Sequence, residues 1–130
     1  MKKAILTNSA PAPIGPYSQA VQAGGVLYIS GQIAINPVSG ELVMENIEAE
    51  THQVLKNLGA ILNQAGLTFN HVLSCSVFVK DISLFSRINE VYAQYFNSDV
   101  PPARALVQVT ELPKLVNIEI SAIAQIPNQT

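Results

Sequence analysis

The sequence predicts an α+β fold in which two helices pack on one face of a single sheet of about six strands. Two segments carry apolar residues at three- and four-residue steps, the period of an amphipathic helix, and five segments have the composition and alternation of strands. Their order along the chain is β-β-α-β-α-β-β, with a further short strand expected near the N-terminus. Two helices can cover only one face of such a sheet, so the other face is left for solvent or a partner.

Strands and tight turns account for the first third of the chain. The proline-rich residues 9–16 form a loop, because proline lacks an N–H and favours extended neighbours. Gly24-Gly25 tolerates positive φ and suits a hairpin, and residues 36–40 have the composition of a turn. The expected strands are about 17–22, 26–30, 72–79, 103–109 and 116–125, with a short one at 3–6.

The first helix is the clearest element. Asn46 suits the N-cap, and Glu48 and Glu50 put negative charge at the positive end of the helix dipole. Gly66 follows the last turn, where a left-handed residue often ends a helix. The apolar stripe consists of Ile47, Val54, Leu55, Leu58, Ile61, Leu62 and Ala65.

A second helix is expected from a cap at Asp81 or Ser83 to about Phe96. Its apolar residues recur at helical spacing and should pack on the sheet. Residues 99–102, which include two prolines, end it. The stripe comprises Leu84, Phe85, Ile88, Val91, Tyr92, Tyr95 and Phe96.

Alternation along the strands assigns side chains to the two faces of the sheet. Arg104 alternates with small and β-branched residues, and Glu119 alternates with isoleucines. We therefore predict that Arg104 and Glu119 both point to the face without helices. The other residues expected there are Phe78, Leu106, Gln108, Asn117, Ser121 and Ile123.

The composition indicates a protein that associates with copies of itself. Charged residues make up 12% of the 130 residues, against roughly 25% in a typical soluble domain, and apolar residues reach 48%. So few charges cover a small monomer poorly, and we expect a homo-oligomer. The length is that of one domain, residues 1–130.

The same composition excludes several classes of function. The formal net charge is −2 and the seven basic residues are scattered, which argues against a nucleic-acid partner. No apolar run approaches the roughly 20 residues of a membrane-spanning helix. Cys75 and the distant His52 and His71 lack metal-ligand spacing, and a single cysteine fits a reducing compartment such as the cytoplasm.

Arg104 and Glu119 are the unusual pair among the strand residues. Each stands among apolar or uncharged neighbours, and burying an arginine is costly unless it is partnered. One interpretation is a structural salt bridge at a contact between subunits. The other is an arginine that binds a substrate carboxylate, beside a carboxylate that acts as a base. The residues alone leave both interpretations open.

Six short motifs occur between about Ala10 and Ala124. They are Gly15-Pro16-Tyr17-Ser18, Ser30-Gly31-Gln32-Ile33, Val77-Phe78-Val79-Lys80-Asp81, Asn89-Glu90-Val91-Tyr92, Pro102-Ala103-Arg104 and Ile118-Glu119-Ile120. In this order and at this spacing, the chain resembles the Rid family, the reactive-intermediate deaminases also called YjgF-like proteins. The resemblance covers nearly the whole chain.

This resemblance implies a chorismate-mutase-like fold assembled as a homotrimer, with sites in the three clefts between subunits. It implies a hydrolase that converts 2-imino acids, such as 2-iminobutanoate and 2-iminopropanoate, to 2-oxo acids and ammonia. Pyridoxal-phosphate dehydratases that act on threonine and serine release these imines and their enamine tautomers. The resemblance implies that neither a cofactor nor a metal is needed.

The resemblance also implies roles for individual residues. Arg104 matches the arginine that binds the substrate carboxylate. Glu119 matches the acidic residue that positions or activates the attacking water. Tyr17 matches a tyrosine that hydrogen-bonds near the substrate.

Four further residues match positions that line the cleft. Ser30 and Gly31 match a stretch whose hydroxyl and backbone face the substrate, and Asn89 matches a position on the second helix. Leu106 stands where many members carry cysteine, and we expect its backbone carbonyl to supply the contact.

Two alternative functions remain open on the sequence. One is a non-catalytic trimer that binds small carboxylates or regulates a partner. Leu106 and Thr110, which depart from the family pattern, favour it, whereas the presence of Arg104 opposes it, and the added Pro101 is a further departure that could reshape the rim of the pocket. The other is the endoribonuclease or translation-inhibitor activity attributed to some members, which the net charge of −2 opposes.

Overall fold

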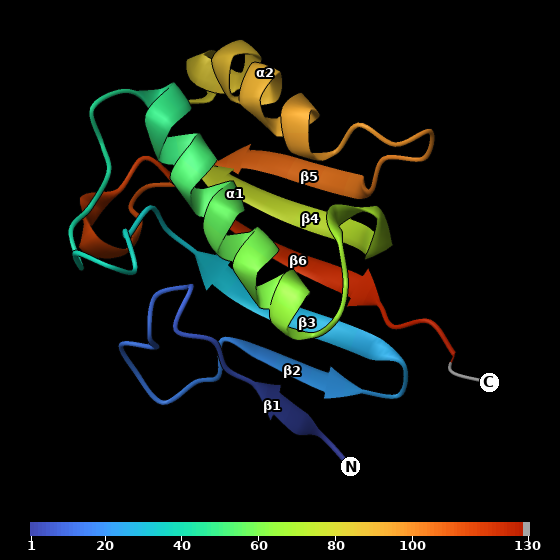
Figure 1. Cartoon of the computed structure of the whole chain (residues 1–130). Helices are drawn as coiled ribbons and strands as arrows, with labels where there is room; N and C mark the ends of the chain where they lie inside the picture. The colour runs from blue at the N-terminus through green and yellow to red at the C-terminus, as the bar shows by residue number, and fades with distance from the viewer. Residues whose placement is uncertain (129–130) are drawn as a thin grey trace.

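The structure is a computed structural model that describes residues 1–128. These residues form one sheet with two helices on one of its faces, as predicted (Figure 1). The strand order is β1-β2-β3-β6-β4-β5, and all neighbours are antiparallel except β4 and β5, which are parallel. The strands are β1 Lys3–Ile5, β2 Ala20–Ala23, β3 Val26–Gln32, β4 Val72–Val79, β5 Ala103–Gln108 and β6 Ile118–Gln125.

The predicted hairpin joins β2 to β3, and its glycines have φ values of 56° at Gly24 and 78° at Gly25. The strand predicted at 17–22 needs correction. Tyr17 lies in a turn ahead of β2, because its N–H donates to the Gly15 carbonyl at 2.9 Å. In β4 the register shifts between Val72 and Ser74, so the residue between them, Leu73, is half exposed and does not face the core.

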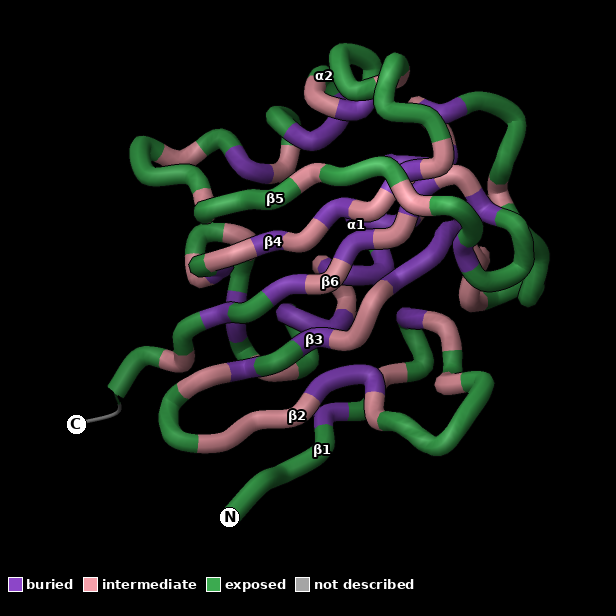
Figure 2. Tube along the Cα trace, turned by 180° about the vertical axis from the view of Figure 1, so that it is seen from behind, coloured by how far each residue is buried: buried purple, intermediate pink, exposed green. Residues whose placement is uncertain are grey.

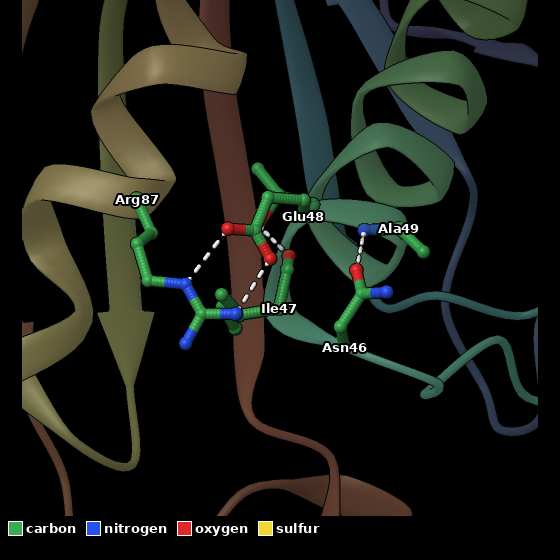
Figure 3. Close-up of polar contacts among 6 residues, drawn as sticks. Asn46, Ile47, Glu48, Ala49 and Arg87 are labelled. Carbon is green, nitrogen blue, oxygen red and sulfur yellow. Dashed lines mark hydrogen bonds and ion pairs between the residues drawn. The ribbon is translucent and has the colours of Figure 1, made fainter.

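Helix α1 spans Ile47–Gln64 and begins as predicted, with the Asn46 Oδ1 accepting the Ala49 N–H at 2.8 Å. Helix α2 spans Phe85–Tyr95 and follows a 3-10 turn at Ile82–Leu84. Figure 3 shows how the start of α1 is tied to α2: the Arg87 guanidinium donates twice to the Glu48 carboxylate, each time at 2.7 Å.

The core lies between the two helices and the sheet. The helical stripes meet the strand residues that point toward them, and these side chains are almost fully buried. On β6 the isoleucines at 118 and 120 are completely inaccessible to solvent. The other largest buried apolar side chains are Leu27, Leu55, Leu58, Ile61, Leu62, Ile88, Val54 and Val77.

A buried carboxylate connects α1 to the start of β6. Glu50 has no solvent exposure. Its Oε2 accepts the N–H groups of Asn117 at 2.7 Å and of Ile118 at 3.2 Å, and its Oε1 accepts from the Asn117 side chain at 2.8 Å. Buried carboxylates are stable when such donors satisfy their oxygens. Glu50 thereby fixes the backbone directly ahead of Glu119.

The face away from the helices carries exposed apolar side chains. Figure 2 views the molecule from behind the helices, and much of β5 is exposed there. Tyr28 on β3 is 51% exposed, Val107 on β5 is 45% exposed and Ile123 on β6 is 38% exposed. Large apolar side chains at these levels of exposure are typical of a face that meets a partner.

Candidate active site

A pocket of about 380 Å³ lies where the proline-rich loop crosses β3 and β6. Four of the residues predicted for the site share it, namely Tyr17, Ser30, Gly31 and Glu119. The rest of its wall is mainly apolar and comprises Pro11, Ala12, Ile14, Ile33, Ile35 and Pro113, together with Gln19 and Gln32. A mainly apolar pocket with a few convergent polar groups is a typical ligand site.

Gly31 and Glu119 lie in direct contact at an irregularity in the sheet. The pairing of β3 with β6 shifts register between Ile29 and Gln32, which includes Gly31 in a bulge. A Cβ added at Gly31 would lie 2.6 Å from the Glu119 Oε2, closer than non-bonded atoms approach. The carboxylate thus fills the space that any larger residue at position 31 would need.

The hydroxyl groups of Tyr17 and Ser30 differ in their availability. Tyr17 is 48% exposed, and its phenol oxygen accepts the Ile14 N–H at 3.4 Å. The Ser30 hydroxyl donates to the Ser18 carbonyl at 2.6 Å, so its proton is already engaged by the backbone. The Tyr17 phenol therefore remains a donor toward the pocket, while Ser30 can only accept there.

One buried side chain holds the proline-rich loop in place. Gln19 is 1% exposed, and its Oε1 accepts the Thr7 N–H at 2.8 Å. Its Nε2 lies within hydrogen-bond distance of the carbonyls of Thr7 at 3.0 Å, Ala10 at 3.3 Å and Pro11 at 2.9 Å. Prolines cannot anchor a loop through their own nitrogen, so Gln19 supplies the link that forms one wall of the pocket.

Arg104 lies on the helix side of β5, at the edge of the sheet. In the parallel ladder it stands opposite Cys75, which is buried beneath the helices. Its Nη1 donates to the Asn89 Oδ1 at 2.7 Å, and its Cζ lies 4.8 Å from the centroid of the Tyr92 ring. Asn89 was predicted to line the cleft, and in this chain it contacts Arg104.

The prediction that Arg104 and Glu119 share the helix-free face is wrong. Glu119 lines the pocket, whereas Arg104 points toward α2. Leu106 and Gln108 also lie on the helix side of β5. Leu106 packs against the main core, and the Gln108 Oε1 accepts the N–H of Ile82 at 2.9 Å. A salt bridge between Arg104 and Glu119 within one chain is therefore excluded.

The register of β4 against β5 explains this reversal. It places Arg104 opposite Cys75 and Leu106 opposite Val77, and both β4 residues face the core. The more apolar set on β5, including Val107, consequently faces away from the helices. Alternation within one strand cannot reveal this, because it does not distinguish a face that packs on the core from a face that packs on a partner.

The two charged groups of the predicted site lack charged partners. Burial raises the pKa of the Glu119 carboxyl above its ordinary value. Within residues 1–128 the ion pairs are Lys80–Glu111 and Arg87–Glu48, so neither Arg104 nor Glu119 is paired there. Each therefore keeps its capacity to bind an opposite charge or a polar ligand.

Other chemically active residues fall outside the pocket. Burial raises the pKa of the Cys75 thiol, which disfavours its reactive thiolate form. The His52 Nδ1 lies 2.8 Å from the Tyr95 hydroxyl between the two helices, as part of their packing. Among the residues described, no group of His, Cys, Asp and Glu is arranged to hold a metal ion, and no helix is long and apolar enough to cross a membrane.

Sequence reasoning missed the two glutamines in the pocket wall. Gln19 and Gln32 are both at least nine-tenths buried. Gln19 lies within the strand predicted at 17–22 and Gln32 follows the one predicted at 26–30, and an amide at either place looks like an ordinary surface residue. For Gln19 the available signal was the proline-rich loop, whose unpaired carbonyls require a donor from elsewhere in the chain.

Comparisons with known proteins give matches over nearly the whole chain. The family model described as endoribonuclease L-PSP matches residues 7–126. A RutC family protein of Pyrococcus horikoshii is 52% identical over 124 residues, which cover 95% of this chain and 98% of that protein. The 2-iminobutanoate/2-iminopropanoate deaminase of Mus musculus is 48% identical over 124 residues, covering 95% and 91% of the two chains. The crystal structure of E. coli TdcF with bound serine has a TM-score of 0.91 at 40% identity, and the match covers 96% of this chain and 99% of that one.

Proposed function

Since the chain belongs to the Rid family of YjgF-like and RutC proteins, we propose that it hydrolyses the C=N bond of 2-imino acids such as 2-iminobutanoate and 2-iminopropanoate. The products are a 2-oxo acid and ammonia. The Mus musculus relative is named for this activity, and TdcF binds serine, which carries the same carboxylate and a side chain of similar size. The observation that carries the proposal is the half-buried Glu119 carboxylate beside open pocket space.

The proposed site requires two copies of the chain. Arg104 and Glu119 lie on opposite sides of the sheet in one copy, so only association can bring the guanidinium of one copy to the pocket of its neighbour. We infer a homotrimer with one site in each intersubunit cleft. The low fraction of charged residues and the exposed apolar side chains of the helix-free face support this assembly.

In this arrangement each charged residue has one task. Arg104 of one copy binds the substrate carboxylate through two parallel N–H donors and thereby orients the imine carbon. Ionised Glu119 of the neighbouring copy holds a water molecule by accepting a hydrogen bond from it. The Tyr17 phenol is available to hydrogen-bond to the substrate, and Ser30 to accept from it.

The hydrolysis then proceeds by proton transfers through Glu119. The water oxygen attacks the carbon of the protonated imine, its proton passes to Glu119, and the C=N π electrons move to nitrogen. Glu119 returns that proton to the amine nitrogen, the C–N bond breaks, and the remaining hydroxyl proton leaves with the ammonia as ammonium. One water is consumed and Glu119 ends ionised, so atoms and charge balance.

A coupled assay tests this function. A threonine dehydratase generates 2-iminobutanoate, and the rate of 2-oxobutanoate release is measured with and without the purified protein. We expect the wild type to accelerate release, and Arg104→Ala and Glu119→Gln to lose the acceleration. Arg87→Ala is the matched control, because Arg87 is an exposed arginine whose partner is Glu48. No acceleration by the wild type would contradict the proposal.

Carboxylate binding without turnover is the second candidate. Leu106 favours it, because many members carry cysteine at this position. In this structure the Leu106 side chain packs against the core, so a catalytic contribution there is limited to the backbone. Titration with 2-oxobutanoate separates the candidates: binding together with an inactive wild type supports the binding protein. RNA cleavage by the purified protein, lost in Arg104→Ala, would instead support the endoribonuclease.

A further inference from the structure

Arg104 is held by two uncharged side chains of α2. The Asn89 Oδ1 accepts from Nη1 at 2.7 Å, and the Tyr92 ring lies under the guanidinium, with 4.8 Å between Cζ and the ring centroid. Asn89 and Tyr92 are three residues apart on α2, and this spacing puts them side by side on one face of the helix. Figure 1 shows α2 running beside β5, the strand that carries Arg104.

The Tyr92 ring is itself fixed. It is 8% exposed, and it packs against Phe96 with 4.4 Å between ring centroids. Its hydroxyl is buried among the core residues near the Cys75 thiol and makes no well-formed hydrogen bond among the described residues. The Tyr92 ring attracts the guanidinium through the negative potential of its face, a cation–π contact that leaves the charge of Arg104 unneutralised.

A second arginine of the same region shows the contrast. Arg87 donates from Nε and Nη2 to both oxygens of Glu48, so its charge and its bidentate edge are occupied. Arg104 has given a single donor to a neutral amide. Of its five N–H donors, the others have no acceptor among residues 1–128 and are open to a planar anion, and no carboxylate of these residues pairs with its charge.

We propose that Asn89 and Tyr92 are positioning residues that hold the Arg104 guanidinium ready for the substrate carboxylate while leaving its charge free. This inference rests on the proposed function, and it reassigns Asn89 from a substrate contact to a residue that acts through Arg104. The neutrality of the pair is essential: a carboxylate at position 89 would bind the guanidinium more strongly and compete with the substrate.

Asn89→Asp is the decisive variant, because it keeps the shape of the side chain and adds the competing charge. In the coupled dehydratase assay we expect its KM for the imine to rise about tenfold or more, with a smaller change in kcat. Asn89→Ala and Tyr92→Leu, which remove one support each, should raise KM by about two- to fivefold. Asn63→Asp on the exposed surface of α1 is the matched charge control and should leave KM unchanged. An Asn89→Asp KM within twofold of the wild type would overturn the proposal.

A measurement independent of turnover separates this proposal from the proposed function. In 15N-labelled protein, a held guanidinium gives resolved side-chain signals for Arg104 with slow rotation, and we expect these in the wild type. They should broaden or merge in Asn89→Ala and in Tyr92→Leu. A freely rotating Arg104 in the folded wild type would overturn the positioning role. An inactive wild type with a held Arg104 would instead reject only the deaminase.

Discussion

The two faces of the sheet place apolar residues in different surroundings. On the covered face, Ile120 of β6 is inaccessible to solvent beneath α1 and α2. On the other face, Ile123 of the same strand is 38% exposed in a single chain. The two proposed catalytic charges are divided in the same way, with Arg104 on the helix side and Glu119 on the open side. The covered face forms the hydrophobic core of the chain, and we propose that the open face forms the contacts between subunits and the sites between them.

Mixing two inactive variants tests this division most strongly. Arg104→Ala and Glu119→Gln alone should each lose the rate contributed by the missing group, about 10²- to 10⁴-fold for a general base. If each site takes Arg104 from one copy and Glu119 from the next, refolding the two variants together should restore about one quarter of the wild-type activity. This follows because every mixed three-membered ring contains one intact site. Zero recovery in mixed trimers would reject the shared site.

A matched pair of isoleucine substitutions compares the two faces directly. Ile120→Ala removes a fully buried side chain, and we expect it to cost about 2–5 kcal/mol of unfolding free energy at any protein concentration. Ile123→Ala should cost less within the chain and should chiefly weaken association, so its effect should grow on dilution. Urea denaturation and sedimentation at several concentrations measure both. Equal, concentration-independent losses would contradict the proposed interface.

The Gly31–Glu119 contact offers a subtler change on the open face. Gly31→Ala places a Cβ where the Glu119 carboxylate now lies, and the carboxylate must move. Because small displacements of a reacting group are costly, we expect kcat to fall about 10²-fold with little loss of stability. The assay and thermal unfolding are compared with those of Gly40→Ala. Gly40, unlike Gly31, has a positive φ, of 76°, and nothing lies within 4 Å of its added Cβ, so Gly40→Ala should cost some stability through backbone strain and leave kcat unchanged. Normal kcat in Gly31→Ala would show that the contact is dispensable.

The pH profile tests the burial of Glu119. Because burial raises its pKa above the ordinary 4.5, we expect kcat/KM to fall on acidification through a limb above pH 4.5. The folded chain then binds this proton more tightly than the unfolded chain, so ionised Glu119 lowers stability once the pH exceeds the raised pKa. Glu119→Gln should consequently be inactive but more stable than the wild type at neutral pH. A less stable variant would contradict this sign.

The smallest effect belongs to the ion pair between α1 and α2. The hydrogen bonds from Arg87 lower the pKa of Glu48 from 4.5 to about 2. The contribution of the Arg87–Glu48 pair to folding stability is therefore complete above pH 4.5 and is lost as the pH falls toward 2. Both groups are exposed, so we expect a small change in unfolding midpoint, which Arg87→Ala should abolish. Thermal unfolding of both proteins across this pH range measures it, and an identical pH dependence would contradict the pairing.

Local signals predicted the helices and the hairpin well. Asn46 caps α1, Asp81 caps the turn ahead of α2, and Gly24-Gly25 forms the hairpin, because each choice depends on a few neighbouring residues. Which side of β5 faces the helices was not predictable from local signals. It depends on pairing with β4 across a helical crossover, and the apolar exposed side of β5, which carries Val107, imitates a core-facing side.

The site was predictable only as a set of residues. Tyr17, Ser30, Gly31 and Glu119 do line one pocket, while Arg104 contacts α2 instead. The bulge at Gly31 arises from the pairing of β3 with β6, which are far apart in sequence, and such long-range register leaves no trace in local periodicity.

Glu50 links the position of α1 to the position of Glu119, which lines the pocket on the opposite face of the sheet. The Glu50 carboxylate accepts the N–H groups of Asn117, just ahead of β6, and of Ile118, the first residue of β6, and Glu119 follows directly. A shift of α1 would therefore move β6 along its own axis and change the position of the Glu119 carboxylate in the pocket on the other side of the sheet. If the proposed function is correct, substitutions in α1 should change the reaction rate although α1 does not line the pocket.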